Sequence, residues 1–129
     1  MDIIHSDNAP EAKGPYSQAV RSGAFLFMAG QIALDPQSGK LVAGDIGVQV
    51  QQIFRNIEAV LNEAGLTLAH IVKTTIFLKN MDDFPEVNAV YEACLNGHKP
   101  ARSTVEVARL PLDAQIEIEC IAENRTPMP

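Results

Sequence analysis

The sequence predicts an α+β domain of two layers, in which two α-helices pack on one face of a single mixed β-sheet. Two segments with helical periodicity lie between runs that alternate as strands do, in the order strands, helix, strand, helix and a final hairpin. The chain has 129 residues, of which 47% are hydrophobic, and this is enough for one core. We therefore expect one domain over residues 1–129.

The first part of the chain is expected to form three strands. A short strand lies around Ile3, and residues 17–21 and 24–29 are extended runs joined by a turn at Ser22-Gly23, where glycine accepts a positive φ. Residues 24–29 are apolar at almost every position, which indicates an interior strand whose second face is also covered, by a helix or by another subunit. The next segment, 32–47, is rich in Pro, Gly and Ser and predicts a long loop.

The middle of the chain predicts a helix and a strand. Apolar residues repeat at intervals of three and four over 45–64, which is typical of an amphipathic helix, and Gly65 ends it as a C-cap. Residues 71–79 alternate in the manner of a strand, with Val72 expected on the same face as Ile76.

The last part predicts a second helix and a hairpin. Asp82 is the expected N-cap of that helix, and Asn96-Gly97 ends it. Residues 103–107 and 115–123 then read as two strands joined by a turn at Pro111.

The hairpin is where we expect the chemistry. Successive side chains of a strand point to opposite faces, so Glu117 and Glu119 lie opposite the core residues of their strand. Arg102 is presented from a stiff loop end after Pro100, on the neighbouring strand. A guanidinium can bind a carboxylate through two parallel N–H groups, and a carboxylate can activate water. The alternatives are a surface arginine paired with Glu106 or Glu119, and a solvated Glu117.

Composition excludes several classes of protein. Ten basic and sixteen acidic residues give a net charge of −6, which argues against a nucleic-acid partner. The sequence has no long apolar run and no signal-peptide pattern at its start, so we expect no membrane association and a cytoplasmic location. Cys94 and Cys120 read as buried, reduced thiols. The three histidines, His5, His70 and His98, lack the spacing of metal ligands, and no glycine-rich phosphate loop is present, so no metal and no cofactor are expected.

Several motifs then resemble one protein family. Pro-Ala-Arg-Ser at 100–103, Val-Glu-Val-Ala-Arg-Leu-Pro at 105–111 and Ile-Glu-Ile-Glu at 116–119 are similar to the signature of the RidA/YjgF family. Gly-Pro-Tyr-Ser-Gln-Ala at 14–19, Gly-Gln-Ile at 30–32, Ile-Val-Lys-Thr-Thr at 71–75 and Val-Asn-Ala-Val-Tyr at 87–91 match further. The resemblance covers nearly the whole chain in order.

The resemblance implies a fold, an assembly and roles for single residues. It implies a chorismate-mutase-like fold and homotrimers that form through the uncovered sheet face, with ligand clefts between subunits. Arg102 would bind the carboxylate of a small 2-imino or 2-keto acid, and Glu117 would position the attacking water. The remaining substrate-binding positions that it implies are Tyr16, Gly30, Asn88 and Thr104, the last of which is often cysteine in relatives.

The activity implied is the cofactor-free hydrolysis of reactive 2-enamine and 2-imino acids, such as 2-aminoacrylate, 2-iminopropanoate and 2-iminobutanoate, to 2-keto acids and ammonia. One alternative is a trimer that binds small carboxylates and regulates a partner without catalysis. Another is an RNA-cleaving translation inhibitor, which the acidic charge disfavours. Ala29 and Lys99 depart from the family pattern, and the segment before Pro100 is shorter than in relatives, so the preferred imino acid stays open.

Overall fold

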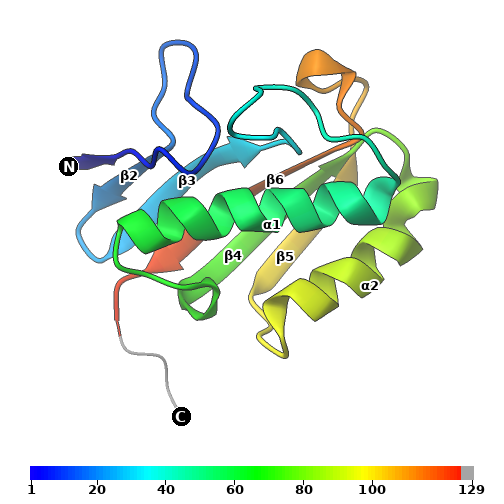
Figure 1. The fold of residues 1–129 in the computed structure, drawn as a ribbon. Helices are drawn as coiled ribbons and strands as arrows, with labels where there is room; N and C mark the ends of the chain where they lie inside the picture. Colours follow the sequence, from blue (N-terminus) through cyan, green and yellow to red (C-terminus); the bar gives the residue numbers. More distant parts are fainter. Residues whose placement is uncertain (126–129) are drawn as a thin grey trace.

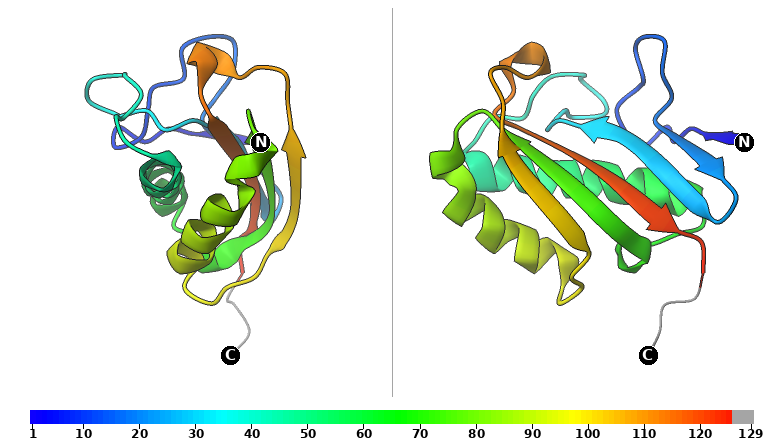
Figure 2. Two further views of the ribbon diagram at one scale, coloured as in Figure 1. Left: turned by 90° about the vertical axis from the view of Figure 1, so that its right-hand side faces the viewer. Right: turned by 180° about the vertical axis from the view of Figure 1, so that it is seen from behind.

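The computed structural model describes residues 1–125 and has the two layers expected from the sequence (Figures 1 and 2). The six strands are β1 (Asp2–Ile4), β2 (Ala19–Ser22), β3 (Phe25–Gln31), β4 (Ile71–Leu78), β5 (Ala101–Glu106) and β6 (Ile116–Glu123). The helices are α1 (Ile46–Glu63) and α2 (Phe84–Leu95), with short 3₁₀ turns at Leu68–His70, Met81–Asp83 and Pro111–Asp113. The strands form one mixed sheet in the order β1-β2-β3-β6-β4-β5, and both helices cover the same face. The predicted α+β architecture is confirmed.

The predicted hairpin between the last two strands is wrong. β6 lies between β3 and β4 and is antiparallel to both, whereas β5 pairs in parallel with β4 at the edge of the sheet. Two parallel neighbours need a crossover, and α2 provides it between β4 and β5. The turn at Pro111 therefore carries the chain past the end of β4 into the middle of the sheet, where Ile116 and Ile118 are fully buried.

The core lies between α1 and the inner face of the sheet. Ile53, Ile57 and Leu61 follow the predicted helical spacing and are fully buried. Asp45 caps α1, because its side chain accepts a hydrogen bond from Val48 N at 3.0 Å. Burial of this apolar stripe holds α1 against the sheet. Figure 1 shows the helix lying across the strands.

Three local predictions are corrected. The turn between β2 and β3 is Gly23-Ala24, because Ser22 pairs with Phe25. The second helix begins at Phe84, after a 3₁₀ turn, and its N-cap is Asp83, not Asp82, with no capping bond from the Asp83 side chain. Asn80 caps the 3₁₀ turn, because its side chain accepts from Asp82 N at 2.9 Å. The predicted end of the helix at Asn96-Gly97 is confirmed.

The third correction concerns the face on which Val72 lies. The pairing of β4 with β6 shifts between Ile71 and Lys73. Because this irregularity interrupts the alternation, Ile71 is 1% exposed and Val72 is 38% exposed. Val72 therefore does not share the buried face of Ile76, contrary to the prediction.

The sheet face turned away from the helices is called the open face below. Neither helix covers it (Figure 2). Phe25 and Phe27 of β3 are 42% and 43% exposed there, and Val105 of β5 is 41% exposed. The position of β3 inside the sheet is confirmed, but its second face is bare within a single chain. An apolar face of this kind is typical of an association surface.

Candidate functional site

Arg102 is held against α2. Its position on β5 pairs with Thr74 of β4, which is fully buried and bonded to the Tyr91 hydroxyl of α2 at 2.7 Å. Arg102 therefore points toward the helix layer. Its Nη1 donates to Asn88 Oδ1 at 2.7 Å, and the guanidinium carbon lies 5.2 Å from the Phe84 ring centroid and 5.0 Å from that of Tyr91.

This environment leaves the guanidinium available to an anion. An amide oxygen and two aromatic faces orient the group without neutralising its charge. Arg102 forms no ion pair with Glu106 or Glu119 within residues 1–125, so the structure does not contain the surface ion pair considered as an alternative. Burial raises the pKa of Tyr91, whereas its bond with Thr74 and the charge of Arg102 lower that pKa.

A cavity of about 400 Å³ opens beside Arg102 and is called the Arg102 cavity. Its lining comes from α2 and from the connection that leads to β5: Asn88, Tyr91, Glu92, His98, Lys99, Pro100 and Arg102. The ring of His98 fixes the connection, because its Nε2 lies 2.6 Å from the Ile71 carbonyl oxygen. Two residues along β5, the Oγ1 of Thr104 is buried and has no hydrogen-bond partner within residues 1–125. That hydroxyl keeps both a donor and an acceptor unused.

Glu117 is the centre of a second group of residues. It lies on β6 opposite the buried Ile116 and Ile118, as predicted, and is half-buried on the open face. Burial, and then the charge of Glu119, raise the pKa of Glu117 above its ordinary value of 4.5. A carboxylate with a raised pKa is a stronger base than one in water.

Gly30 lies directly against Glu117. A Cβ at position 30 would be 2.5 Å from Glu117 Oε2 and 2.8 Å from its Cδ. Gly30 therefore permits a close approach between β3 and the carboxylate.

A cavity of about 880 Å³, called the Glu117 cavity, surrounds this contact. Tyr16 is 56% exposed and lines it from the loop before β2, and Leu112 lines it from the turn before β6.

The two groups do not meet within one chain. Arg102 pairs with Thr74, and Glu117 pairs with Phe77. Positions 74 and 77 of β4 are three residues apart, so their side chains point to opposite faces. The prediction that an arginine and a carboxylate lie on neighbouring strands is therefore wrong, because β4 separates them and they face opposite ways.

The structure thus divides the predicted site residues into two sets. Asn88 contacts Arg102, and Thr104 follows it on the same face of β5. Tyr16 and Gly30 share the cavity of Glu117.

Sequence reasoning missed the aromatic support of Arg102. Phe84 and Tyr91 were not among the predicted site residues, although Asn88 lies between them at intervals of four and three. That spacing puts all three on one face of the helix. It was the available signal for a binding surface.

Within residues 1–125, no group of three His, Cys, Asp or Glu side chains is placed to hold a metal ion. Neither helix of this part of the chain has the length and apolar character needed to cross a bilayer. Cys94 and Cys120 are free thiols, and burial raises the pKa of Cys120 to about 12.

Comparison with known proteins connects this arrangement to a family. A family model described as Endoribonuclease L-PSP matches residues 6–124. A RutC family protein of Pyrococcus horikoshii is 50% identical over 121 residues, which cover 94% of this chain and 96% of that protein. The 2-iminobutanoate/2-iminopropanoate deaminase of Salmonella typhimurium is 50% identical over 125 residues, which cover 95% of this chain and 97% of the deaminase.

A solved structure extends the comparison to three dimensions. The crystal structure of E. coli TdcF with bound serine superposes with a TM-score of 0.92 at 40% identity. The match covers 98% of this chain and 100% of that one. The whole two-layer fold is therefore shared.

Proposed function

Because the chain belongs to the Endoribonuclease L-PSP family, the RidA/YjgF family of the sequence motifs, we propose that it hydrolyses small 2-imino acids to 2-keto acids and ammonia. The proposed substrates are 2-aminoacrylate, 2-iminopropanoate and 2-iminobutanoate. We place the reaction in the cytoplasm, where pyridoxal-phosphate enzymes would release these compounds. The reaction requires no cofactor in this proposal.

The observation that carries the proposal is the pairing of two complementary half-sites. One holds the charged Arg102 between aromatic rings with an amide as its partner. The other holds Glu117 half-buried beside a cavity, and burial, followed by the charge of Glu119, raises the pKa of Glu117. An anion-binding group and a general base are what hydrolysis of a carboxylate-bearing imine needs.

The half-sites would be joined by assembly. Arg102 lies on β5, the edge strand, and Glu117 lies on the open face, so the edge of one copy can meet the open face of the next. A contact between two different surfaces of the same chain forms a closed ring when the rotation that relates neighbouring copies is a whole fraction of a turn. We propose a homotrimer with three such clefts. The exposed Phe25 and Phe27 support a contact at this face.

The proposed chemistry follows from the two groups. Arg102 binds the substrate carboxylate through parallel N–H groups, and Asn88 keeps the guanidinium oriented. Glu117 takes a proton from a water molecule as the oxygen of that water adds to the C=N carbon. The same proton then passes to the nitrogen and gives a carbinolamine. Glu117 next takes the proton of the carbinolamine hydroxyl and passes it to the nitrogen, the C–N bond breaks, and ammonia leaves as the C=O bond forms. An enamine first gains a proton at carbon 3 and loses one from its nitrogen to become the imine.

The reaction also proceeds in water without an enzyme, so the site needs to supply a modest acceleration only. Positioning of substrate and water by Arg102 and Glu117 is sufficient for that, with neither a metal nor a covalent nucleophile.

The test couples a serine or threonine dehydratase to keto-acid detection, with semicarbazide present to trap the imine. Wild type should release keto acid faster than the trap captures it. Arg102→Ala should lose about 100-fold or more of that activity, and Glu117→Gln about 100- to 10,000-fold. Arg109→Ala and Glu119→Gln serve as charge-matched controls and should keep it, because both side chains are exposed outside the cavities. Unchanged activity in Arg102→Ala would end the proposal.

A second candidate is a binding protein without catalysis. It is favoured by the serine bound to TdcF, a small molecule that carries a carboxylate. In that case Arg102→Ala abolishes binding of 2-oxobutanoate, Glu117→Gln leaves binding intact, and wild type does not accelerate imine hydrolysis.

RNA cleavage, suggested by the name of the family model, is disfavoured by the net charge of −6. Salt-dependent binding of single-stranded RNA would revive it.

A further inference from the structure

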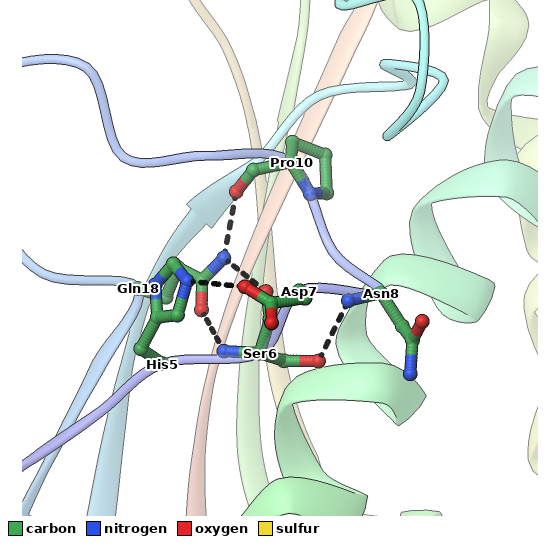
Figure 3. Close-up of polar contacts among 6 residues, drawn as sticks. All are labelled: His5, Ser6, Asp7, Asn8, Pro10 and Gln18. Carbon is green, nitrogen blue, oxygen red and sulfur yellow. Dashed lines mark hydrogen bonds and ion pairs between the residues drawn. The ribbon is translucent and has the colours of Figure 1, made fainter.

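Gln18 lies at the base of the loop that walls the Glu117 cavity, and it is only 2% exposed. Its carboxamide bonds to the backbone of the N-terminal segment, as Figure 3 shows. Oε1 accepts from Ser6 N at 2.6 Å, while Nε2 donates to the carbonyl oxygens of Ser6 at 3.1 Å and Pro10 at 2.8 Å. One buried side chain therefore holds both Ser6 and Pro10.

The main chain of the same residue is tied to the strand that contacts Glu117. The Gln18 carbonyl accepts a hydrogen bond from Ala29 N at 2.9 Å. Ala29 directly precedes Gly30, where a Cβ would lie 2.5 Å from Glu117 Oε2. Gln18 thus connects the N-terminal segment to the floor of the Glu117 cavity.

The loop between these anchors has little other support. Residues 11–17 leave the core at Pro10 and return at Gln18, and this loop projects beyond the sheet (Figure 1). Glu11, Lys13 and Tyr16 line the cavity from it. The Tyr16 N–H bonds to Gly14 O at 2.9 Å, which is a contact inside the loop. The position of the loop is therefore set at its two ends, and Gln18 holds both.

We propose that Gln18 is a positioning residue for the reaction: its buried carboxamide fixes Ser6 and Pro10, and thereby places the loop with Tyr16 over Glu117. This inference rests on the proposed function for its catalytic consequence. Its structural part concerns the loop and the solvent access of Glu117, and both can be measured without any substrate.

Two substitutions separate the bonds from the shape of the side chain. Gln18→Met keeps an unbranched side chain of similar length and removes every hydrogen bond. Gln18→Glu keeps the shape and the acceptor for Ser6 N, but it places a carboxylate oxygen against the carbonyls of Ser6 and Pro10. The control is Arg21→Gln. Arg21 is on β2, outside the Glu117 cavity, and this substitution removes the hydrogen bond that Arg21 Nη2 donates to Ala64 O.

The first measurement is hydrogen exchange of the peptide 6–16, followed by mass spectrometry. In Gln18→Met and Gln18→Glu we expect exchange in this peptide to be faster by about tenfold or more, with peptides from α1 unchanged. Arg21→Gln should leave peptide 6–16 as in wild type. These results do not depend on activity.

The second measurement is the pKa of Glu117 from the carbon-13 resonance of its carboxyl group. The charged groups near this carboxyl are Glu119 on the same strand, and Glu11 and Lys13 across the cavity. When the loop moves away, water reaches Glu117, and its pKa should fall toward the ordinary value in both Gln18 variants. A residue that only stabilises the fold would leave this pKa unchanged, as Arg21→Gln should.

The third measurement is imine hydrolysis, at a temperature where all variants are folded. The value of kcat/KM should fall by about tenfold or more in Gln18→Met and stay within twofold of wild type in Arg21→Gln. If wild type does not hydrolyse imines, the proposed function fails, while exchange and the Glu117 pKa still decide the role of Gln18. Normal exchange of peptide 6–16, or an unchanged Glu117 pKa, in Gln18→Met would overturn the inference.

Discussion

Arg102 and Glu117 face opposite sides of one sheet, with a single strand between theirs. The register of β4 defines this relationship, because Thr74 lies beside Arg102 and Phe77 beside Glu117. A single chain therefore presents a cation-bearing half-site at its edge and a carboxylate half-site on its open face. Under the proposed assembly, a substrate that touches both groups lies between two copies of the chain.

Mixing two inactive variants tests this arrangement. Arg102→Ala and Glu117→Gln should each be inactive alone, and activity should return when they are unfolded and refolded together. With random assembly, a cleft receives an intact Arg102 and an intact Glu117 in about a quarter of cases, so about a quarter of wild-type activity is expected. Recovery is read by the imine-trapping assay. A mixture that stays inactive, although mass spectrometry shows mixed oligomers, would contradict a shared cleft.

Glu117 should make both activity and stability depend on pH. Burial, followed by the charge of Glu119, raises its folded-state pKa above 4.5, so the stabilising contribution is complete below the unfolded pKa and is lost as pH rises through the folded value. Glu117→Gln should therefore be more stable than wild type near pH 7, and this advantage should vanish below pH 4.5. Urea unfolding at the two pH values measures the difference.

Glu117→Gln should also lose about 100- to 10,000-fold in kcat, because the proposed general base is absent. Glu119→Gln is the matched control. It should keep activity but shift the acid limb of the pH–rate profile to lower pH, since one cause of the raised Glu117 pKa is removed.

Gly30→Ala should impair catalysis while the fold is kept. The new Cβ would lie 2.5 Å from Glu117 Oε2, so the end of the flexible glutamate must move away from its place in the cavity. We expect kcat to fall by about tenfold or more, with a far-ultraviolet circular dichroism spectrum like that of wild type. Gly23→Ala is the control, because a Cβ there meets nothing within 4 Å, and its φ of +60° costs about 1 kcal/mol of stability without touching the site. Equal activity losses in both variants would argue against the contact with Glu117.

Leu112→Asn should stabilise the protein. Leu112 is 66% exposed and has a φ of 56°, a left-handed conformation that asparagine adopts more readily than leucine. The expected gain in the free energy of unfolding is about 1 kcal/mol. Leu110→Asn, at a buried position with a φ of −120°, should instead cost about 3 kcal/mol. Urea denaturation of both variants checks the pair, and a destabilised Leu112→Asn would mean that its side chain packs more than its exposure indicates.

Local periodicity was sufficient to predict most elements and the faces of their side chains. The spacing of apolar residues predicted α1, and alternation placed Glu117 opposite the buried Ile116. Both features depend on neighbours close in sequence, which a pattern of three, four or two residues records.

The order of the strands in the sheet could not be predicted from local periodicity. Alternation says which residues of a strand share a face, but it does not say which strand lies alongside. Nothing local in residues 103–107 distinguishes a parallel partner reached through α2 from an antiparallel partner reached through the turn at Pro111. The error about neighbouring strands followed directly.

In the proposed assembly, the division of the site between two surfaces separates folding from catalysis. A single chain would bury its core and complete its sheet while it held only halves of two different clefts. Under the proposed assembly, specific activity should therefore collapse on dilution below the dissociation constant of the oligomer. A molecule that binds Arg102 of one copy and Glu117 of another would bind the oligomer only, so ligand binding would stabilise the oligomer against dissociation.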